Sequence, residues 1–522
     1  MTVTPELDAD EDPAGDAAGV ETGDAAGVET EAGTEAEPEG ARGWRDPVRW
    51  VLGAMVVGWS VLFIVLGWLR QARFATFSFD LGIYDQAVWL LSRFHDPFVT
   101  VRGLEFFGHH VNPILLLFVP FYWLGAGPLF LLSAQVVVQA SGAIAIYLLA
   151  RDRLRDRWLA VALAAVLLLN PTYQWLTWEF FHPDALAIAP LLFAYWAART
   201  ERWKWFVLFA VLAAACKEDV ALVIAVMGVL IAVRGHRKIG LLTLGASIAW
   251  YVIATRVVIP LSNGIGPFYD TFFGDLGKNP IEVGTHLATH PRQAIELATE
   301  HDRISYYQMM FAPVAFLPLL AIPTLLIAGP MLAVNMFSSF PYTRDIRYHY
   351  SALVLVGIIL ATVEAIAWVA VKRPGLVRFL VGLVVASSLA ATVAWGPSPI
   401  GVKYHTGIWP LQSDRQAAHD QAVDLVPDGA PTSAIYNLLP HLAHRDEIYD
   451  FPVPWRNVNW GVDGEHLADP ARVQWVVVDR RELSTDDLAL LNRLLAHQFR
   501  VVLDRDDMVV AKRVHPPPRH RG

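Results

Sequence analysis

The sequence predicts an α-helical membrane protein that crosses the bilayer about eleven times and ends in a small α/β domain. Of the 522 residues, 54% are hydrophobic and only 17% are charged, whereas soluble domains carry roughly 25% charged residues. Several apolar stretches reach the roughly 20 residues that a helix needs to cross the hydrocarbon core. Aromatic residues gather at the ends of these stretches, as they do at membrane interfaces.

The N-terminal segment differs in composition from the rest of the chain. Residues 1–41 contain 13 Asp or Glu and neither Lys nor Arg, and GDAAGVET occurs twice, from Gly15 and from Gly23. A segment with so few large apolar residues cannot bury enough surface to fold. We therefore expect residues 1–43 to form a disordered acidic tail on the cytoplasmic side. The net charge of −9 belongs to this tail, because the remainder has 41 basic and 37 acidic residues.

Clusters of Lys and Arg predict the topology, because such clusters tend to stay in the cytoplasm. The five clusters cover residues 42–49, 151–157, 199–204, 234–238 and 372–378. All five are cytoplasmic if the crossings are residues 50–69, 128–150, 158–170, 185–198, 205–216, 220–233, 239–259, 306–322, 323–340, 351–371 and 376–395. The N-terminus is then cytoplasmic, the C-terminus is extracytoplasmic, and the membrane domain covers residues 44–395.

Two long loops face outward in this scheme, residues 70–127 and 260–305. The first contains an apolar stretch, residues 113–124, which is too short to span and is expected to lie in the membrane interface. Residues 81–94 are amphipathic and are predicted to form a second interfacial helix.

Residues 396–522 contain no apolar span and are predicted to form a soluble extracytoplasmic α/β domain. PTSAIYN, VQWVVVD and FRVVLDRDDMVVAKR have the short β-branched pattern of buried strands. STDDLALLNRLLAHQ has a helical apolar period behind a capping Ser484.

The candidate functional residues lie at the outer ends of the predicted crossings. Charged groups are costly near hydrocarbon and therefore usually have a function there. Since four separate segments deliver them to the same side, we expect them to line one cavity. They are Asp80, Asp85, His109 and His110 in the first loop, Glu179, His182 and Asp184 in WEFFHPDAL, Lys217, Glu218 and Asp219 in CKED, and Arg344, Asp345, Arg347 and His349 in RDIRYHY.

Each group also has a structural interpretation. Asp80 could cap a helix, and Asp85 could be a structural carboxylate. At least one of the adjacent histidines, His109 and His110, is expected to make only a loop hydrogen bond. His182 could simply start a helix, with Pro183 in its first turn. The residues from Lys217 to Asp219, and the arginines Arg344 and Arg347, could likewise form turns and surface pairs.

Cofactors are not predicted. The sequence has neither a Walker loop nor a GxGxxG motif, which argues against a nucleotide-driven pump. The Asp and His residues offer ligands suited to Mg, Mn or Zn, but without a diagnostic spacing. A divalent metal therefore stays an alternative.

Five segments, FDLGIYDQAVW, HHVNPILLLFVPFYWL, HPDAL, KEDVAL and NLLPHLAHRDEIYDFP, resemble the DUF2079 family of membrane proteins over residues 50–510. The layout also resembles the GT-C glycosyltransferases, such as protein mannosyltransferases and lipid A aminoarabinose transferases. Those enzymes share a first outer loop with interfacial helices and a large later outer loop. This chain has Asp80 followed by Leu81 where protein mannosyltransferases have a paired Asp-Glu.

The resemblance implies a cell-envelope glycosyltransferase that transfers a hexose or pentose from a polyprenyl-phosphate lipid, with inversion, to an extracytoplasmic glycan, lipid or protein. The catalytic base would be Asp80 or Asp85, with Lys217, Arg344 and Arg347 as phosphate counterions. His109, His110, Glu179, His182, Asp184, Glu218 and Asp219 would bind substrate, and nucleic acid is not an expected partner. The alternatives are a transporter or flippase of a lipid-linked or small polar solute, and a non-catalytic membrane scaffold.

Overall fold

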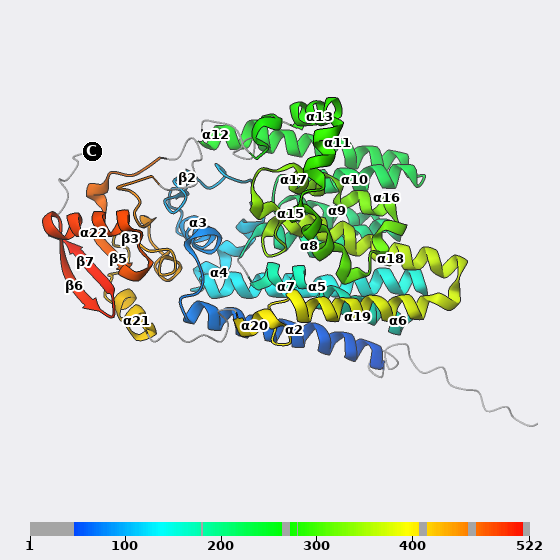
Figure 1. Cartoon of the computed structure of the whole chain (residues 1–522), viewed down its shortest axis with the longest axis horizontal. Helices are drawn as coiled ribbons and strands as arrows, with labels where there is room; N and C mark the ends of the chain where they lie inside the picture. Colours follow the sequence, from blue (N-terminus) through cyan, green and yellow to red (C-terminus); the bar gives the residue numbers. More distant parts are fainter. Residues whose placement is uncertain are drawn as a thin grey trace, which may run out of the picture. The chain divides into compact units, whose positions relative to one another are not determined.

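The computed structural model describes residues 46–178, 181–263, 272–278, 280–406, 415–457 and 466–514, and the predicted tail lies outside them. The helices and strands belong to one compact unit, Pro47–Gly522 (Figure 1). The division into a membrane domain of residues 44–395 and a domain of residues 396–522 stays a prediction.

Among the residues that the structure describes, five helices are long and apolar enough to cross a membrane, and a bent pair gives a sixth candidate. The pair, α6 and α7, bends by 50°, and Asn170 between them caps α7 by accepting from the Thr172 backbone N–H at 3.0 Å. The long helices are α2 (Pro47–Ala72), α5 (Pro128–Leu154), α11 (Arg237–Ile253) continued by η3 (Ala254–Val258) and α12 (Ile259–Asn263), α18 (Ala352–Lys372) and α19 (Val377–Trp395), and the bent pair is α6 (Arg157–Leu169) and α7 (Pro171–Trp178).

Three shorter helices occupy predicted crossings. They are α8 (Pro183–Arg199), α9 (Trp203–Ala214) and α10 (Val220–Val233). These helices do not meet the length and composition expected of a membrane span, so the number of eleven crossings stays a prediction.

The predicted crossings at residues 306–322 and 323–340 are not continuous helices. The backbone turns left-handed at Ala315 and Phe316. Prolines at positions 313, 318, 323 and 330 account for the breaks, because each removes a helical N–H and clashes with the preceding turn. The resulting pieces are α15 (His301–Phe311), η6 (Ala312–Val314), η7 (Leu317–Leu320), α16 (Ile322–Leu325), η8 (Leu326–Ala328) and α17 (Gly329–Phe337).

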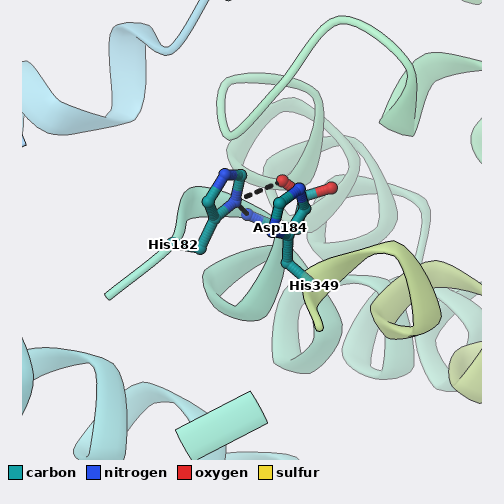
Figure 2. Close-up of side chains that lie close together, drawn as sticks. All are labelled: His182, Asp184 and His349. Carbon is teal, nitrogen blue, oxygen red and sulfur yellow. Dashed lines mark hydrogen bonds and ion pairs between the residues drawn. The ribbon is translucent and has the colours of Figure 1, made fainter. Parts of the chain in front are cut away.

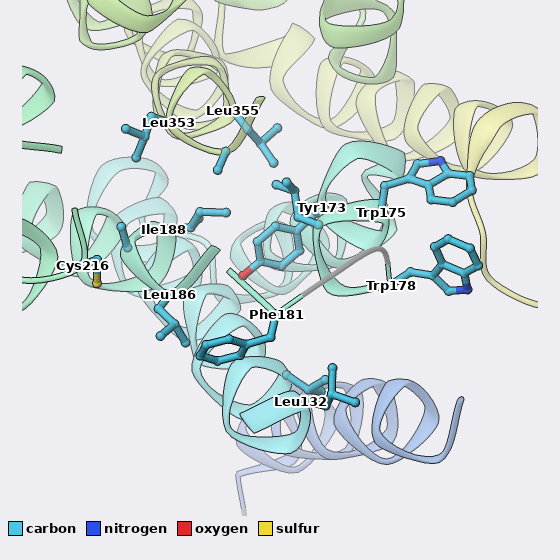
Figure 3. Packing of buried hydrophobic residues seen from close by; sticks show 14 of the residues in the cluster. Leu132, Tyr173, Trp175, Trp178, Phe181, Leu186, Ile188, Cys216, Leu353 and Leu355 are labelled. Carbon is cyan, nitrogen blue, oxygen red and sulfur yellow. The ribbon is translucent and has the colours of Figure 1, made fainter. Parts of the chain in front are cut away.

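Helix α18 lies at the centre of the bundle, with 83% of its apolar window buried inside the protein. It contacts α5, α8 and α19, and α8 also contacts α5 and α10. Figure 3 shows the packing of Leu353 and Leu355 of α18 with Tyr173 of α7 and Ile188 of α8. This packing fixes where α8, α10 and α18 begin, and those beginnings form the candidate site.

The first loop folds into helix α3, a short hairpin and an apolar segment. Helix α3 confirms the helix predicted within residues 81–94 and is buried within the protein, while its place at the membrane interface stays a prediction. The C-terminal region covers it: Thr100 of the loop donates to the Ile448 carbonyl at 2.8 Å, and Gln86 donates to the Arg445 carbonyl at 3.2 Å. The elements are η1 (Ser78–Gly82), α3 (Ile83–Ser92), β1 (Phe98–Val99), β2 (Leu104–Glu105), η2 (Pro113–Phe118) and α4 (Val119–Trp123).

Residues 415–514 contain a five-stranded mixed sheet in the order β4-β3-β5-β7-β6. Strand β3 is parallel to β4 and β5, whereas β7 is antiparallel to β5 and β6. The three predicted strand segments and the helix capped by Ser484 are confirmed. The elements are α21 (Gln416–Asp424), β3 (Thr432–Ala434), β4 (Ile448–Asp450), β5 (Trp475–Asp479), α22 (Thr485–His497), β6 (Phe499–Arg505) and β7 (Met508–Arg513).

Candidate functional site

The candidate site forms where three helices begin together. His182 is the N-cap of α8, in extended conformation, and its Nδ1 accepts from the Asp184 backbone N–H at 3.4 Å. Asp219 precedes α10 at the end of the turn that follows α9. The one-turn segment η10 (His349–Ser351) leads into α18. The HPD helix start and the KED turn, considered above as structural features, are therefore both structural and part of the site.

A chain of close polar contacts joins two of these helix starts. His182 Nδ1 lies 2.6 Å from Asp184 Oδ2, and Lys217 Nζ lies 3.2 Å from Asp184 Oδ1. The same Lys217 Nζ lies 3.2 Å from Asp219 Oδ2. The ring of His349 stacks on that of His182, with centroids 3.7 Å apart and an interplanar angle of 3° (Figure 2). Lys217 is 4% exposed, so it serves as an internal counterion.

The first loop reaches the same place through its two histidines. His110 Nδ1 lies 2.8 Å from Glu218 Oε1, and the Val111 N–H donates to Glu218 Oε2 at 3.0 Å. The ring centroids of His110 and His182 are 6.4 Å apart, and His109 lies against His110 at 4.1 Å. Burial holds the pKa values of His109 and His110 below their ordinary value, which favours neutral rings.

Asp80 faces this group from η1. Its Oδ1 is 3.9 Å from His182 Nε2, which also lies 3.3 Å from the Tyr84 hydroxyl. Burial raises the pKa of the Asp80 carboxyl, while the nearby His182 acts in the opposite direction. The backbone of Asp80 has φ 64° and ψ −80°, close to the rare and strained γ-turn region. Such strain in a residue other than glycine is concentrated at functional sites.

Asp80 is not a helix cap. The N-cap position of α3 is Gly82, and no side-chain hydrogen bond caps either η1 or α3. The Asp80 side chain is 17% exposed, in contrast to the fully buried Asp85.

We use the name histidine cluster for Asp80, His110, His182, Asp184, Lys217, Glu218, Asp219 and His349. Among the ion pairs that the described residues form here, Lys217 is the one Lys or Arg. The negative charge of the carboxylates is partly reduced, because burial raises the pKa of Asp219 to about 7. The N-terminal ends of α8, α10 and α18 add partial positive charge.

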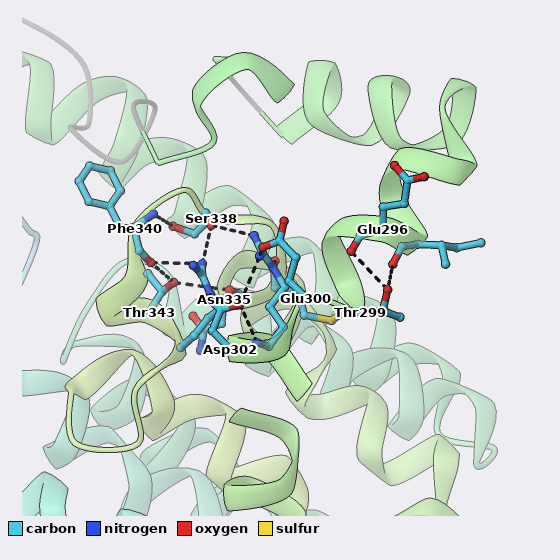
Figure 4. A network of polar contacts seen from close by, with 12 residues as sticks. Glu296, Thr299, Glu300, Asp302, Asn335, Ser338, Phe340 and Thr343 are labelled. Carbon is cyan, nitrogen blue, oxygen red and sulfur yellow. Dashed lines mark hydrogen bonds and ion pairs between the residues drawn. The ribbon is translucent and has the colours of Figure 1, made fainter. Parts of the chain in front are cut away.

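Four predicted site residues, Asp85, Arg344, Asp345 and Arg347, lie elsewhere. Asp85 accepts from the Tyr122 hydroxyl at 2.6 Å and contacts His444 Nε2 at 3.2 Å. Arg344 donates to Asp302 at 2.7 Å and to the Ser338 carbonyl at 2.6 Å, two residues labelled in the polar network of Figure 4. Arg347 pairs with Asp345 at 2.6 Å and is half-exposed. The remaining predicted residue, Glu179, lies outside the described residues.

Sequence reasoning missed Tyr84 and Arg70 as site residues. His349 was noticed in RDIRYHY, but its stacking on His182 needs the packing of α8 against α18. Arg70, which is 2% exposed, donates to the carbonyls of Ala75 and Trp178. It lines a cleft with Phe77 and Leu81, the residues around Asp80. Only the fact that Arg70 ends the first apolar stretch could have singled it out.

The fold and the cluster define a helical membrane protein with ionisable groups gathered at one end of its central helices. The chain belongs to the DUF2079 family of predicted membrane proteins, whose model matches residues 70–510. Two similar solved structures are ArnT from Cupriavidus metallidurans bound to undecaprenyl phosphate, with 14% identity and a TM-score of 0.47, and the same protein in the apo state, with 13% identity and a TM-score of 0.46. Both alignments cover 87% of this chain and 98% of the ArnT chain. No curated protein matches the sequence.

Proposed function

We propose that this protein is a membrane glycosyltransferase that transfers a sugar from a polyprenyl-phosphate donor to an extracytoplasmic acceptor with inversion. The observation that carries the proposal is the position of Asp80. A strained, partly exposed carboxylate with a raised pKa faces a histidine at the place where three helices begin. A carboxylate in such a place suits a general base.

Asp80 would take the proton of the acceptor hydroxyl. The hydroxyl oxygen would form a bond to the anomeric carbon while the bond from that carbon to the phosphate oxygen breaks. The electron pair would leave with the lipid phosphate, whose growing charge needs stabilisation.

The stabilising groups differ from those that the sequence suggested. Lys217 is already paired with Asp184 and Asp219, so we assign it to the positioning of these carboxylates. The helix N-termini and Arg70 are better candidates for the phosphate. Arg70 donates to the carbonyls of Ala75 and Trp178, and apolar residues such as Phe63, Leu132 and Val136 line the cleft that it borders. That lining suits a lipid chain.

The transporter alternative is less well supported. Transporters place charges on broken helices near the bilayer midplane. The broken segment here, FAPVAFLPLL at residues 311–320, contains no charged residue. The ionisable groups lie at the ends of continuous helices instead.

The test has a cellular arm and a purified arm. A deletion strain should accumulate a polyprenyl-phosphate sugar that mass spectrometry of lipid extracts can identify, and the wild-type gene should remove it. Purified protein in nanodiscs should convert that donor to polyprenyl phosphate when it is mixed with acceptor-containing envelope extract. Asp80→Asn should lower the rate by about 10²–10⁴, the usual effect of losing a general base.

The matched control is Asp85→Asn, which changes a buried carboxylate in the same loop. Wild-type transfer by both variants would refute an aspartate base at either position, whereas the absence of transfer by the wild type would refute the enzyme. If only Asp85→Asn loses activity, the proposed mechanism still holds and Asp85 is the general base. If Asp80→Asn restores the deletion strain, and deletion leaves the lipid profile unchanged, the non-catalytic scaffold is favoured.

A further inference from the structure

The histidine cluster contains three groups arranged as metal ligands. One ligand atom from each of His182, Asp184 and His349 can be chosen so that all three lie within 4.8 Å of one another. Figure 2 shows the three side chains converging, two from the start of α8 and one from the segment before α18. His182 and Asp184 are 4% and 2% exposed. We propose that these three residues bind a divalent transition-metal ion.

Two atoms of these side chains that could serve as ligands have unused hydrogen-bonding capacity. Among the described residues, the buried atoms Asp184 Oδ2 and His349 Nδ1 have no hydrogen-bond partner. Burying a polar atom without a partner costs about 1–3 kcal/mol, and each such atom in a native structure needs an explanation. A cation between them would provide one, because both are lone-pair donors.

The third ligand atom, His182 Nδ1, gives the same indication. It accepts the backbone N–H of Asp184 at 3.4 Å. Yet Asp184 Oδ2, itself an acceptor, lies only 2.6 Å away without a hydrogen bond of normal geometry. Two lone-pair atoms so close need a cation between them, either a proton or a metal ion. A tetrahedral ion with ligand bonds of about 2.1 Å would hold them about 3.4 Å apart, which a small side-chain rotation achieves.

The surroundings fit a metal as well. Bound metal ligands are normally held by outer partners. Lys217 Nζ holds Asp184 Oδ1 at 3.2 Å, which leaves Oδ2 for the ion. His182 Nε2 faces the Tyr84 hydroxyl at 3.3 Å and Asp80 at 3.9 Å, so Nδ1 is left for the ion.

The charge balance points the same way. Lys217 is the one Lys or Arg that pairs with the carboxylates of the cluster as the structure describes it. A divalent cation would offset the surplus negative charge and would allow an anionic ligand to approach.

The donor set indicates which metal to expect. Two imidazole nitrogens and one carboxylate suit Zn²⁺ or Mn²⁺, and a catalytic zinc site has three protein ligands with one position open. Mg²⁺ and Ca²⁺ prefer sets made of oxygen alone. We therefore expect Zn²⁺ to bind more tightly than Mn²⁺, and both more tightly than Mg²⁺.

The test measures metal binding by the full-length protein without any sugar substrate. Purified protein in detergent is stripped with a chelator, equilibrated with Zn²⁺, Mn²⁺ or Mg²⁺, and analysed for bound metal and thermal unfolding. The wild type should retain about one Zn²⁺ per chain and unfold at a higher temperature with zinc than without it. His349→Gln removes a ligand whose Nδ1 makes no hydrogen bond, so it should fold normally and lose the zinc-dependent shift.

A separate histidine pair needs its own control. His286 and His290 lie one turn apart on exposed α13 (Pro280–Thr289) and its C-terminal end, with ring centroids 4.4 Å apart. Such a pair can take up zinc by itself. The double variant His286→Gln with His290→Gln should still bind about one Zn²⁺ per chain. When His349→Gln is added to it, the affinity for zinc should fall by more than the about 10–100-fold that is typical of losing an outer partner of a metal ligand.

Zinc binding that is absent from the wild type, or unchanged by His349→Gln in that background, would overturn the metal site. Since the readout needs no donor or acceptor, it is independent of the proposed transfer activity. Metal binding without sugar transfer would support the metal site and refute the glycosyltransferase proposal. Sugar transfer without metal binding would support the glycosyltransferase and refute the metal site.

Discussion

The two ends of the central helices carry ionic clusters of opposite character. At their beginnings lies the histidine cluster, with one lysine among several carboxylates. At their ends lies what we call the arginine cluster: Glu364 of α18 with Arg153, Arg199, Arg234 and Tyr195. Glu364 lies 2.8 Å from Arg199 and 2.9 Å from Arg153, and Tyr195 donates to it at 3.0 Å. Arg234 in turn donates to the Tyr195 hydroxyl at 3.0 Å.

The same helices connect both clusters. Helix α8 carries Asp184 in its first turn and Arg199 at its end, α10 lies between Asp219 and Arg234, and α18 follows His349 and carries Glu364. At 1.5 Å per residue, the α8 positions are about 22 Å apart along the axis.

The clusters differ in how completely their polar atoms are paired. Both carboxylate oxygens of Glu364 accept hydrogen bonds. In the histidine cluster, atoms of Asp184, Asp219 and His349 lack partners among the described residues. A fully paired buried network fixes structure, whereas retained unpaired groups indicate a ligand. The comparison therefore assigns anchoring to the arginine cluster and binding or catalysis to the histidine cluster.

The largest effect on stability is expected from Lys217→Met. The change leaves buried Asp184 and Asp219 without their cation, and breaking a buried pair from one side costs about 3–5 kcal/mol. Chemical denaturation in detergent would measure the loss, and Lys217→Arg should recover part of it because the charge is kept. Unchanged stability of Lys217→Met would show that the lysine is not an internal counterion.

Glu364→Gln is expected to cost less, about 1–3 kcal/mol, although it affects two arginines. Arg153 and Arg199 are 34% and 21% exposed, so both can turn toward water or lipid phosphate. The same denaturation assay should detect the loss, while the zinc stoichiometry of the folded protein stays unchanged. A change in zinc binding would mean that the two clusters are coupled and would end their separate assignment.

Asp219→Asn tests whether the histidine cluster gives up stability for function. Burial raises the pKa of Asp219 to about 7, so its carboxylate is disfavoured at neutral pH. The neutral amide should therefore raise the free energy of unfolding by about 1 kcal/mol or less while lowering transfer activity. Loss of stability comparable to that of Glu364→Gln would contradict this interpretation.

A pH-dependent effect is expected at Asp450, which receives a hydrogen bond from Ser78 at 2.7 Å beside the Asp80 loop. Burial raises its pKa to about 7 from an ordinary value of 3.8. The folded state then holds a proton that the unfolded state releases between about pH 4 and pH 7, so stability falls over this window and is level above it. Asp450→Asn should flatten that part of the profile of unfolding temperature against pH, and an unchanged slope would show that Asp450 titrates normally.

The sequence by itself determined the local structure. It predicted the long apolar helices, the helix start at His182, the turn at Lys217, three strand segments and the capped helix of the C-terminal region. These features depend on proline, capping residues and apolar periodicity, which act within a few residues. It also named most members of the histidine cluster, because charged residues at the ends of apolar stretches are visible without a structure.

Only the tertiary structure decided which of these residues meet. It paired Lys217 with Asp184, stacked His349 on His182, and joined Asp85 to Tyr122 and His444. It also placed α3 under the C-terminal region and engaged Arg344 with Asp302. These contacts join residues that are remote in sequence, and they depend on how α8, α10 and α18 pack rather than on any local pattern. Hydrophobic periodicity predicts that a helix has a buried face, but the partner of that face is chosen by the fit of whole side chains.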